Sequence, residues 1–362
     1  MRRLYHSSAR TDRYQPAVLA LGLGHGFSDA AAGYLIGSLS AGRLVAELGA
    51  AIMVYNLLAF GGQLPAGIWL DGVRSYRESA VGSLLGMVVA LILLVNGWIW
   101  PAVVLAGLSS AIYHVAGGAI TLASFPEKSR FVGIFSAFGV MGLALGGWCG
   151  AMHCTGVTYL LIGGLTTIAL MVGKVPVPMT QKALITQDKP QLDTHDYLMI
   201  LLLTAIALRS AVWNVIQLLY AQQYDWLLYI ALAAMVGKLI GGWLTDRIPW
   251  KPYALVALAI ALPALGWGYR RLFWLMLGTG LLQSLTPVSV VALQRLFPNT
   301  PATVSGATFG LAIALGGLVS FIPLGSYFSL YTQLLLLGIL SWCLYYSFWS
   351  VDHRRSVLNK ER

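Results

Sequence analysis

Charged residues are scarce in this chain of 362 residues: Asp, Glu, Lys and Arg together make up 10% of it. A soluble domain typically has about 25% charged residues, so the composition excludes an ordinary water-soluble protein. Hydrophobic residues make up 58% of the chain, and its mean hydropathy is +0.74. These values are typical of an integral membrane protein that contacts the lipid bilayer along most of its length.

Several motifs that would indicate other functions are also absent. The P-loop pattern Gly-x-x-x-x-Gly-Lys-Ser/Thr does not occur, which argues against ATP-driven transport by this chain. Neither His-Glu-x-x-His nor Gly-x-Ser-x-Gly is present, which removes the simplest protease and hydrolase interpretations. Three cysteines form no disulfide framework. Nothing in the sequence indicates haem, flavin or a tight metal centre, so we expect no cofactor and no bound metal.

Apolar segments that could cross a bilayer recur along the whole chain. A transmembrane helix needs about 20 apolar residues, and we assign twelve, at 16–38, 45–66, 79–97, 101–124, 131–151, 156–174, 197–220, 226–244, 252–268, 272–294, 302–324 and 331–350. The net charge of +10 comes mainly from loops on one side of the membrane. Membrane orientation therefore accounts for it, and we expect no nucleic-acid partner. The outer loops keep only Arg43, Arg270 and Arg271. The positive-inside rule then places both termini in the cytoplasm, in the cell inner (plasma) membrane.

The segments are organised as two similar halves. A polar linker at 176–196 separates an N-terminal six-helix bundle, 1–175, from a C-terminal one, 197–362. Three features repeat in order at nearly constant offset: Gly67 to Asp71 and Gly242 to Asp246, Phe125-Pro126 and Phe297-Pro298, Ala144 to Gly147 and Ala314 to Gly317. We therefore predict an all-α membrane protein with twelve helices, built from a duplicated unit about a pseudo-twofold axis.

Polar side chains lie near the centres of four apolar segments that are spaced three apart. A charged side chain at the bilayer centre costs roughly 2.5–3.5 kcal/mol, so each is a candidate functional residue. The pattern predicts a solute pathway through a helical bundle and leaves the solute unnamed. The residues are His25 and Asp29 in the first segment, His114 in the fourth, Arg209 in the seventh, and Gln283 with Thr286 in the tenth.

His25 and Asp29 are four residues apart, so they project from the same helix face. Burial disfavours the charged form of each side chain, whereas pairing favours it. The balance can place proton exchange near neutral pH, and His114 lies at the matching depth. We predict a proton relay through Asp29, His25 and His114. The alternative is a structural His–Asp pair that only joins two helices.

Arg209 is the only arginine assigned to the interior of a segment, and its guanidinium stays charged. We expect it to face either a solute anion or Asp29. A pair with Asp29 would be a conformational switch or a permanent structural ion pair. Pro287 is expected to break the tenth helix nearby. The residues predicted to bind the solute are Arg209, Tyr113, Trp213, Asn214, Gln217, Gln283 and Thr286.

Twelve segments arranged as six plus six, with Gly-x-x-x-Asp after the second and eighth, resemble the major facilitator superfamily over essentially the whole chain. The resemblance implies transport by alternating access, with segments one, four, seven and ten around a central cavity. In that family the loop is a latch at the cytoplasmic gate, which implies gating roles for Asp71, Arg74, Asp246 and Arg247. The first copy departs from the pattern, with Gly72 where an arginine is usual. Ordinary charges of an inside loop are the alternative.

Two stretches, Gly24 to Asp29 and Gly107 to His114, are similar to fosmidomycin-resistance-type exporters. This similarity favours export, although Gly147 stands where the antiporter signature has proline. We thus expect a monomeric secondary active transporter of a small-molecule substrate, coupled to the proton, and not an enzyme. One alternative is a non-transporting relative that acts as a membrane sensor or assembly partner. Another is a membrane enzyme acting on a lipid-borne substrate.

Overall fold

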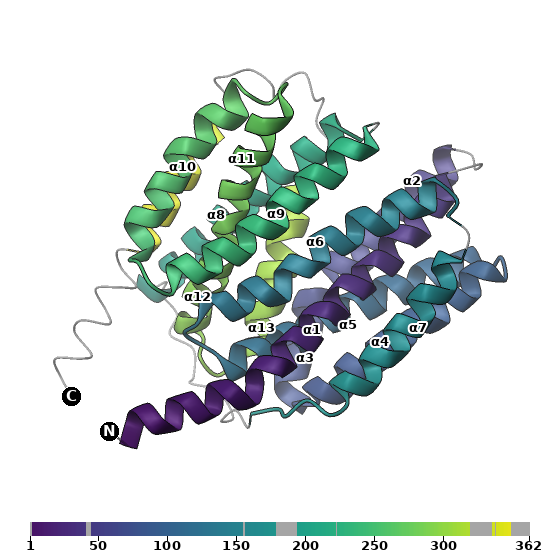
Figure 1. The fold of residues 1–362 in the computed structure, drawn as a ribbon, viewed down its shortest axis with the longest axis horizontal. Coiled ribbons are helices and arrows are strands. Elements are labelled where there is room, and N and C mark those ends of the chain that lie inside the picture. The colour runs from purple at the N-terminus through teal and green to yellow at the C-terminus, as the bar shows by residue number, and fades with distance from the viewer. Residues whose placement is uncertain are drawn as a thin grey trace. The chain divides into compact units, whose positions relative to one another are not determined.

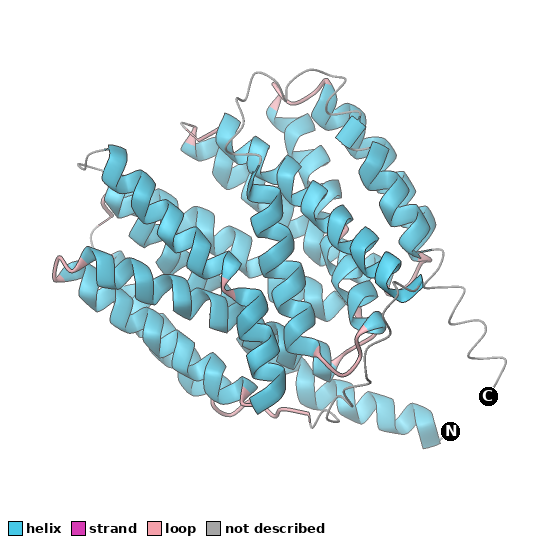
Figure 2. Ribbon diagram, turned by 180° about the vertical axis from the view of Figure 1, so that it is seen from behind, coloured by secondary structure: helices cyan, strands magenta, loops and turns pink. Residues whose placement is uncertain are grey.

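The computed structural model describes residues 2–40, 45–154, 156–178, 194–221, 223–318, 335–336 and 338–348. Nearly all of these residues are helical, and none of them lies in a strand (Figure 2). The predicted all-α class is confirmed for this part of the chain.

The helices of the first sequence half follow the predicted apolar segments, because each segment satisfies its backbone hydrogen bonds internally, as the bilayer requires. Figure 1 labels most of them. They are α1 (Arg2–Ser40), α2 (Val45–Asn56), the π-helical turn η1 (Leu57–Gly61), α3 (Gln63–Val73), α4 (Tyr76–Val95), α5 (Ile99–Ser124), α6 (Ser129–Ala151) and α7 (Val157–Val172).

The second half is also helical, and its π-helical turn lies late in the half, whereas that of the first half lies early. Its elements are α8 (Thr194–Leu219), α9 (Tyr224–Thr245), α10 (Trp250–Gly266), α11 (Leu272–Ser284), α12 (Thr286–Leu296), α13 (Pro301–Ser305), the π-helical turn η2 (Gly306–Leu311) and α14 (Ala312–Gly317). Residues 338–348 are also helical.

Seven helices of the described part are long and apolar enough to cross a membrane, and three shorter apolar helices accompany them. Two of the seven are far more enclosed than the others. In Ile99–Ser124 and in Leu272–Leu296, 78% of the apolar window is buried, against 28% in Glu47–Val73. These enclosed helices carry His114 and the pair Gln283 and Thr286. Their polar side chains therefore face protein rather than lipid.

Contacts within the chain group into two compact units. Unit 1 consists of Met1–Phe125, Ile134–Thr180 and Pro301–Gly310, and unit 2 of Pro126–Gly133, Gln181–Thr300 and Leu311–Arg362. Each unit holds most of one sequence half and one short segment of the other. The two short segments start 175 residues apart, as Asp71 and Asp246 do. The duplication predicted from sequence is thus mirrored in the contacts.

Three helix boundaries deserve comparison with the predicted segments. α1 begins at Arg2 rather than near residue 16, since hydropathy marks only the apolar part of a helix. The second segment was predicted to end at 66, but α3 continues to Val73. Its C-cap is Arg74, whose φ is 60°. Asp71 therefore lies in the last helical turn. The predicted interruption near Pro287 is confirmed, because α11 ends at Ser284 and α12 starts at Thr286.

Close packing of α1 and α6 in unit 1 depends on two glycines of α6 (Figure 1). A Cβ atom at Gly142 would overlap the carbonyl oxygen of Gly26, and one at Gly146 would overlap that of Ala30. Their spacing of four residues puts both on the face toward α1. This small-xxx-small spacing thus brings the backbones of the two helices into contact.

Candidate functional site

Unit 1 brings His25, Asp29 and His114 together, as the sequence predicted. The Nε2 atoms of the two histidines lie 2.8 Å apart. The carboxylate of Asp29 lies beside both, with Oδ2 at 3.3 Å from Nε2 of His25 and Oδ1 at 3.5 Å from Nε2 of His114. His25 and His114 are 5% and 6% exposed, so the cluster is almost sealed from solvent.

The outer nitrogens of both imidazoles are held by backbone carbonyls. Nδ1 of His25 lies 2.9 Å from the carbonyl oxygen of Phe135, and Nδ1 of His114 lies 2.7 Å from that of Ser110. A carbonyl oxygen only accepts, so each Nδ1 carries the hydrogen and donates it. In a neutral imidazole Nε2 is then a bare acceptor. Two bare nitrogens and a carboxylate would thus converge, and the arrangement requires a cation at its centre.

A proton fits this centre better than a metal ion does. The three ligand atoms lie within 4.8 Å of one another, and in the described chain this is the only such group. Two nitrogens bound tetrahedrally to zinc at about 2.1 Å each would lie about 3.4 Å apart. The observed 2.8 Å between the Nε2 atoms is instead a hydrogen-bond distance. That no metal is bound stays a prediction.

Tyr113 borders the cluster, but its hydroxyl is used elsewhere. It donates to the carbonyl oxygen of Leu21 at 2.8 Å, and the side chain is fully buried. This bond joins α5 to α1 beside the cluster. A role of Tyr113 in binding the solute stays a prediction.

Gly139 is a residue of this site that sequence reasoning assigned only to packing. A Cβ atom there would overlap Nε2 of His25 and lie 2.7 Å from Oδ2 of Asp29. α6 therefore covers the cluster at a position where it has no side chain. The carbonyl of Phe135, one turn earlier on α6, holds His25 from the same side. No sequence pattern indicates which glycine of a glycine-rich helix does this.

Gly139→Ala is expected to abolish proton coupling through the cluster. The ring of His25 is fixed by Phe135, so an added methyl group has to separate His25 from Asp29. Alanine stabilises a helix by about 0.5–1 kcal/mol relative to glycine, and the overlap with His25 opposes this gain. Coupling that persists in the folded variant would contradict the prediction. The measurement is proton-coupled transport together with thermal stability. Gly147→Ala is the matched control on α6, since its Cβ would meet nothing closer than 3.9 Å.

Unit 2 brings together Arg209, Gln283 and Thr286. Nη1 of Arg209 donates to Oε1 of Gln283 at 2.8 Å and to Oγ1 of Thr286 at 2.7 Å. Arg209 is 6% exposed and lies on α8. The interruption of the helix before Pro287 places Thr286 at the start of α12, where its hydroxyl reaches the guanidinium.

The other predicted solute-binding residues of α8 lie in different environments. Trp213 and Gln217 follow Arg209 by four and eight residues, so they share its helix face, and both are half-buried. Asn214 donates its amide to the carbonyl oxygen of Ser210 at 2.9 Å. That donor is used within the helix, which leaves only the side-chain oxygen of Asn214 for a solute.

Asp71 caps the start of α13 within unit 1. Its carboxylate accepts from the backbone N–H groups of Ala302 at 3.1 Å and Thr303 at 2.7 Å, and from the hydroxyl of Thr303 at 2.7 Å. Tyr76 donates a further hydroxyl at 2.8 Å. Arg74 is the C-cap of α3. The carboxylate thus satisfies helix donors that otherwise have no intrahelical acceptor.

Asp246 does the same at the start of α6 within unit 2. It accepts from the backbone N–H groups of Ser129 at 2.7 Å and Arg130 at 3.4 Å, and Nε of Arg130 lies 3.9 Å away. Burial raises the pKa of the Asp246 carboxyl, because desolvation outweighs these N–H bonds. Asp246 therefore takes up a proton at higher pH than an exposed aspartate.

Arg247 lies apart from the Asp246 cap. Its guanidinium lies over the ring of Trp243 at 3.8 Å and donates to the carbonyl oxygen of that residue at 3.0 Å. The predicted gating residues therefore differ in kind. The two aspartates make long-range helix caps, whereas the interactions of Arg247 are local.

Comparisons with known proteins agree on family and fold. The sequence model of the Major Facilitator Superfamily matches residues 17–322. A variant of the E. coli fucose:proton symporter FucP matches with a TM-score of 0.69 and 12% identity, over 94% of this chain and 98% of that one. A structure of FucP in the outward conformation matches with a TM-score of 0.68 and 14% identity, over 93% and 98%.

The human organic anion transporter MFSD10 (TETRAN) matches with a TM-score of 0.63 and 16% identity, over 93% of this chain and 99% of that one. None of the curated protein sequences compared with the chain matches it. Likeness at such low identity shows the fold alone. It confirms the predicted architecture of twelve transmembrane helices in two six-helix bundles.

Proposed function

The chain belongs to the major facilitator superfamily, and we propose that it carries a small solute across the membrane by alternating access, coupled to a proton held by His25, Asp29 and His114. It is a multi-pass membrane transporter and not an enzyme. The finer features of the proposal are proton coupling, direction and orientation.

The observation that carries proton coupling is the convergence of three acceptors. Both Nδ1 atoms donate to carbonyls, so the two Nε2 atoms and the carboxylate have no hydrogen among them unless one more proton is bound. With that proton the cluster is an imidazolium, an imidazole and a carboxylate, with no net charge. Without it the cluster has a charge of −1 and two facing lone pairs. Loss of the proton therefore disfavours the contact between α1 and α5.

An alternating-access carrier needs helix contacts, such as that between α1 and α5, whose stability depends on which ligands are bound. A proton that binds one arrangement of α1 and α5 better than another shifts the equilibrium between them by that difference in affinity. Ser305 links the cluster to another helix of unit 1, since its hydroxyl donates to the carbonyl oxygen of His114 at 3.0 Å. Ser305 lies on α13, the helix capped by Asp71. The proton site and one latch are thus connected through a five-residue helix.

The remaining features rest on sequence. The excess of basic residues in one set of loops supports cytoplasmic termini in an inner (plasma) membrane. Similarity of the first and fourth segments to fosmidomycin-resistance-type exporters supports export, and hence proton antiport. FucP shows that this fold serves a proton-coupled carrier, here as a symporter by its name. We propose a monomer as the transporting unit.

Proton flux in proteoliposomes tests the proposal. A ligand is first found by thermal stability of the purified protein across a compound panel at pH 5.5 and 7.5, because a ligand that binds the native state raises its stability. Vesicles loaded with that solute and an internal pH dye are then diluted. Antiport predicts that solute exit acidifies the interior, and symport predicts the reverse. Solute exit without any pH change would contradict coupling. A ligand that binds and never moves would favour the membrane sensor.

A further inference from the structure

Arg209 is a buried cation for which the described residues supply no anion. Its two hydrogen-bond partners, Gln283 and Thr286, are neutral. Thr286 in turn donates to Oε1 of Gln283 at 3.1 Å, so the two partners are already joined to each other. Asp29, the carboxylate that the sequence offered as a counter-charge, directs one oxygen to each of two histidines. The charge of Arg209 is therefore left uncompensated by the described protein.

Such an arrangement is costly for a folded protein. Removing an ion from water is unfavourable, and only a good counter-charge and full hydrogen bonding offset this penalty. Nε of Arg209 is enclosed and has no hydrogen-bond partner. Among the described residues Nη2 also has none, and only Nη1 is bonded. Two of the three guanidinium nitrogens thus lack an acceptor among the described residues, at a site that is 6% exposed.

The unbonded atoms form one edge of the guanidinium. Nε and Nη2 point their hydrogens in parallel, and this fork matches the two oxygens of a carboxylate or a phosphate. Nη1, on the other edge, is fixed by Gln283 and Thr286, which sets the plane of the group. The protein therefore fixes the guanidinium through Nη1 and leaves the Nε–Nη2 edge without an acceptor among the described residues.

We propose that the missing acceptor is the anionic group of the transported solute, so that the substrate is a small organic anion. This inference rests on the proposed function, because it takes α8, α11 and α12 to line the solute path. The shared chemistry is an oxyanion with two oxygens in one plane. Trp213 and Gln217, on the same face of α8, lie where the uncharged part of such a solute would extend.

Matched pairs of compounds test the charge requirement on the unmodified protein. The purified full-length carrier is titrated with benzoate and benzamide, lactate and lactamide, and glycerol 3-phosphate and glycerol, and ligand affinity is read from thermal stability. We expect the charged member of at least one pair to stabilise the protein and its neutral partner to have no effect. Carboxylate and phosphate pairs distinguish the two oxyanions. Equal binding by both members of every pair that binds, or no binding by any, overturns the inference.

Two substitutions test whether Arg209 is the group responsible. Loss of a charged hydrogen-bonding fork should weaken binding of the anion about tenfold to a hundredfold in Arg209→Gln. Arg209→Lys keeps the charge without the fork, so its affinity for the anion should lie between those of the parent and Arg209→Gln. The ligand-free Arg209→Gln protein should be at least as stable as the parent, whereas a structural role predicts a loss. Unchanged anion affinity in Arg209→Gln overturns the inference.

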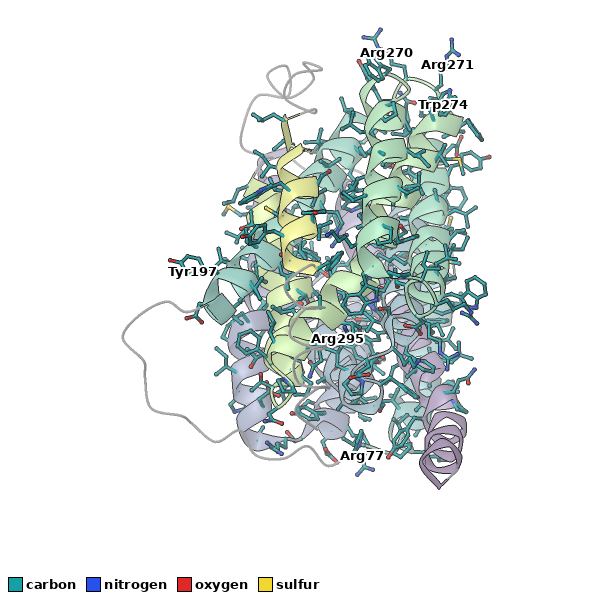
Figure 3. The ribbon with its side chains drawn as sticks, turned by 90° about the vertical axis from the view of Figure 1, so that its left-hand side faces the viewer. Arg77, Tyr197, Arg270, Arg271, Trp274 and Arg295 are labelled. Atoms are coloured by element: carbon teal, nitrogen blue, oxygen red, sulfur yellow. The ribbon has the colours of Figure 1, made fainter. Side chains whose placement is uncertain are left out.

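Arg271→Gln is the matched control, since Arg271 projects outward from the connection between α10 and α11 (Figure 3). It should bind the anion as the parent does. Potassium chloride alone is a further arm. If chloride gives the whole stabilisation and no organic anion adds to it, the site holds an inorganic counter-ion and the inference fails.

These outcomes are distinct from those of the proposed function. Anion binding is measured without any flux, and proton coupling is measured by flux with whichever solute the carrier moves. A neutral solute that drives proton movement would overturn the anion inference alone. An anion that binds through Arg209 and moves without protons would overturn coupling alone.

Discussion

Asp29→Asn is expected to keep solute exchange and to lose solute-driven proton movement. Asparagine has nearly the shape of aspartate, and its amide can donate to Nε2 of one histidine. The converging acceptors then have a donor at every pH, so the cluster no longer needs a proton to stay together. We expect coupled proton flux to fall at least about tenfold, comparable to the loss of one charged hydrogen bond. Exchange of labelled solute across the same vesicles should change far less.

The matched control is Asp225→Asn, since Asp225 is an exposed aspartate in the first turn of α9 and belongs to none of the proposed sites. It removes the same charge and should leave both fluxes as they are. Full proton coupling in Asp29→Asn would show that the cluster is a structural join between α1 and α5. Loss of both fluxes, with normal thermal stability, would instead place Asp29 in solute binding.

The convergence of His25, Asp29 and His114 was predictable because its signal is local. His25 and Asp29 share a helix face by their spacing of four, and the hydropathy pattern puts His114 at the same depth. What fixes the two imidazoles is a different kind of information. The carbonyl of Phe135 lies 110 residues from His25 in sequence, and every residue has a carbonyl. No residue type marks the one that will be used.

Side-chain direction was the weaker part of the prediction for the solute site. Asn214 and Tyr113 are polar residues at the predicted depth, but both give their donors to backbone carbonyls. In an apolar surrounding a polar side chain often bonds to a nearby carbonyl of a helix, four residues back in the case of Asn214. Residue type alone does not separate this from solute binding. Arg209 differs because its five donors exceed what its neighbours accept.

The partners of Asp71 and Asp246 also could not be predicted, because they lie far away in sequence. The family resemblance implied gating roles for Asp71 and Asp246, and in the structure each carboxylate caps the start of another helix. Their partner amides lie 231 and 117 residues away, at Ala302 and Ser129. The duplication makes the two caps equivalent, yet nothing in either sequence stretch names the helix that is capped.

Substituting these aspartates by alanine and by asparagine should separate capping from ion pairing. Asparagine is about as good a helix cap as aspartate, whereas alanine costs about 0.5–2 kcal/mol. Asp71→Ala should therefore speed hydrogen exchange at the amides of Ala302 and Thr303 by up to about thirtyfold, and Asp71→Asn should have a small effect. Exchange by mass spectrometry measures this in peptides covering 301–305.

The repeat supplies the internal control for this experiment. Asp246→Ala should act on the amides of Ser129 and Arg130 and leave those at 302 and 303 near their parent rates, and Asp71→Ala should do the converse. If asparagine behaved as alanine does at either position, the charge rather than the cap would matter there. We do not expect asparagine to behave as alanine does at Asp71, because the carboxylate there accepts from two amides and two hydroxyls. Asp246 is the sharper case, because Arg130 lies close enough for its charge to contribute. A larger effect of asparagine at Asp246 than at Asp71 would show that the two duplicated loops differ in the interaction that stabilises them: a helix cap alone at Asp71, and a cap with an ion pair at Asp246.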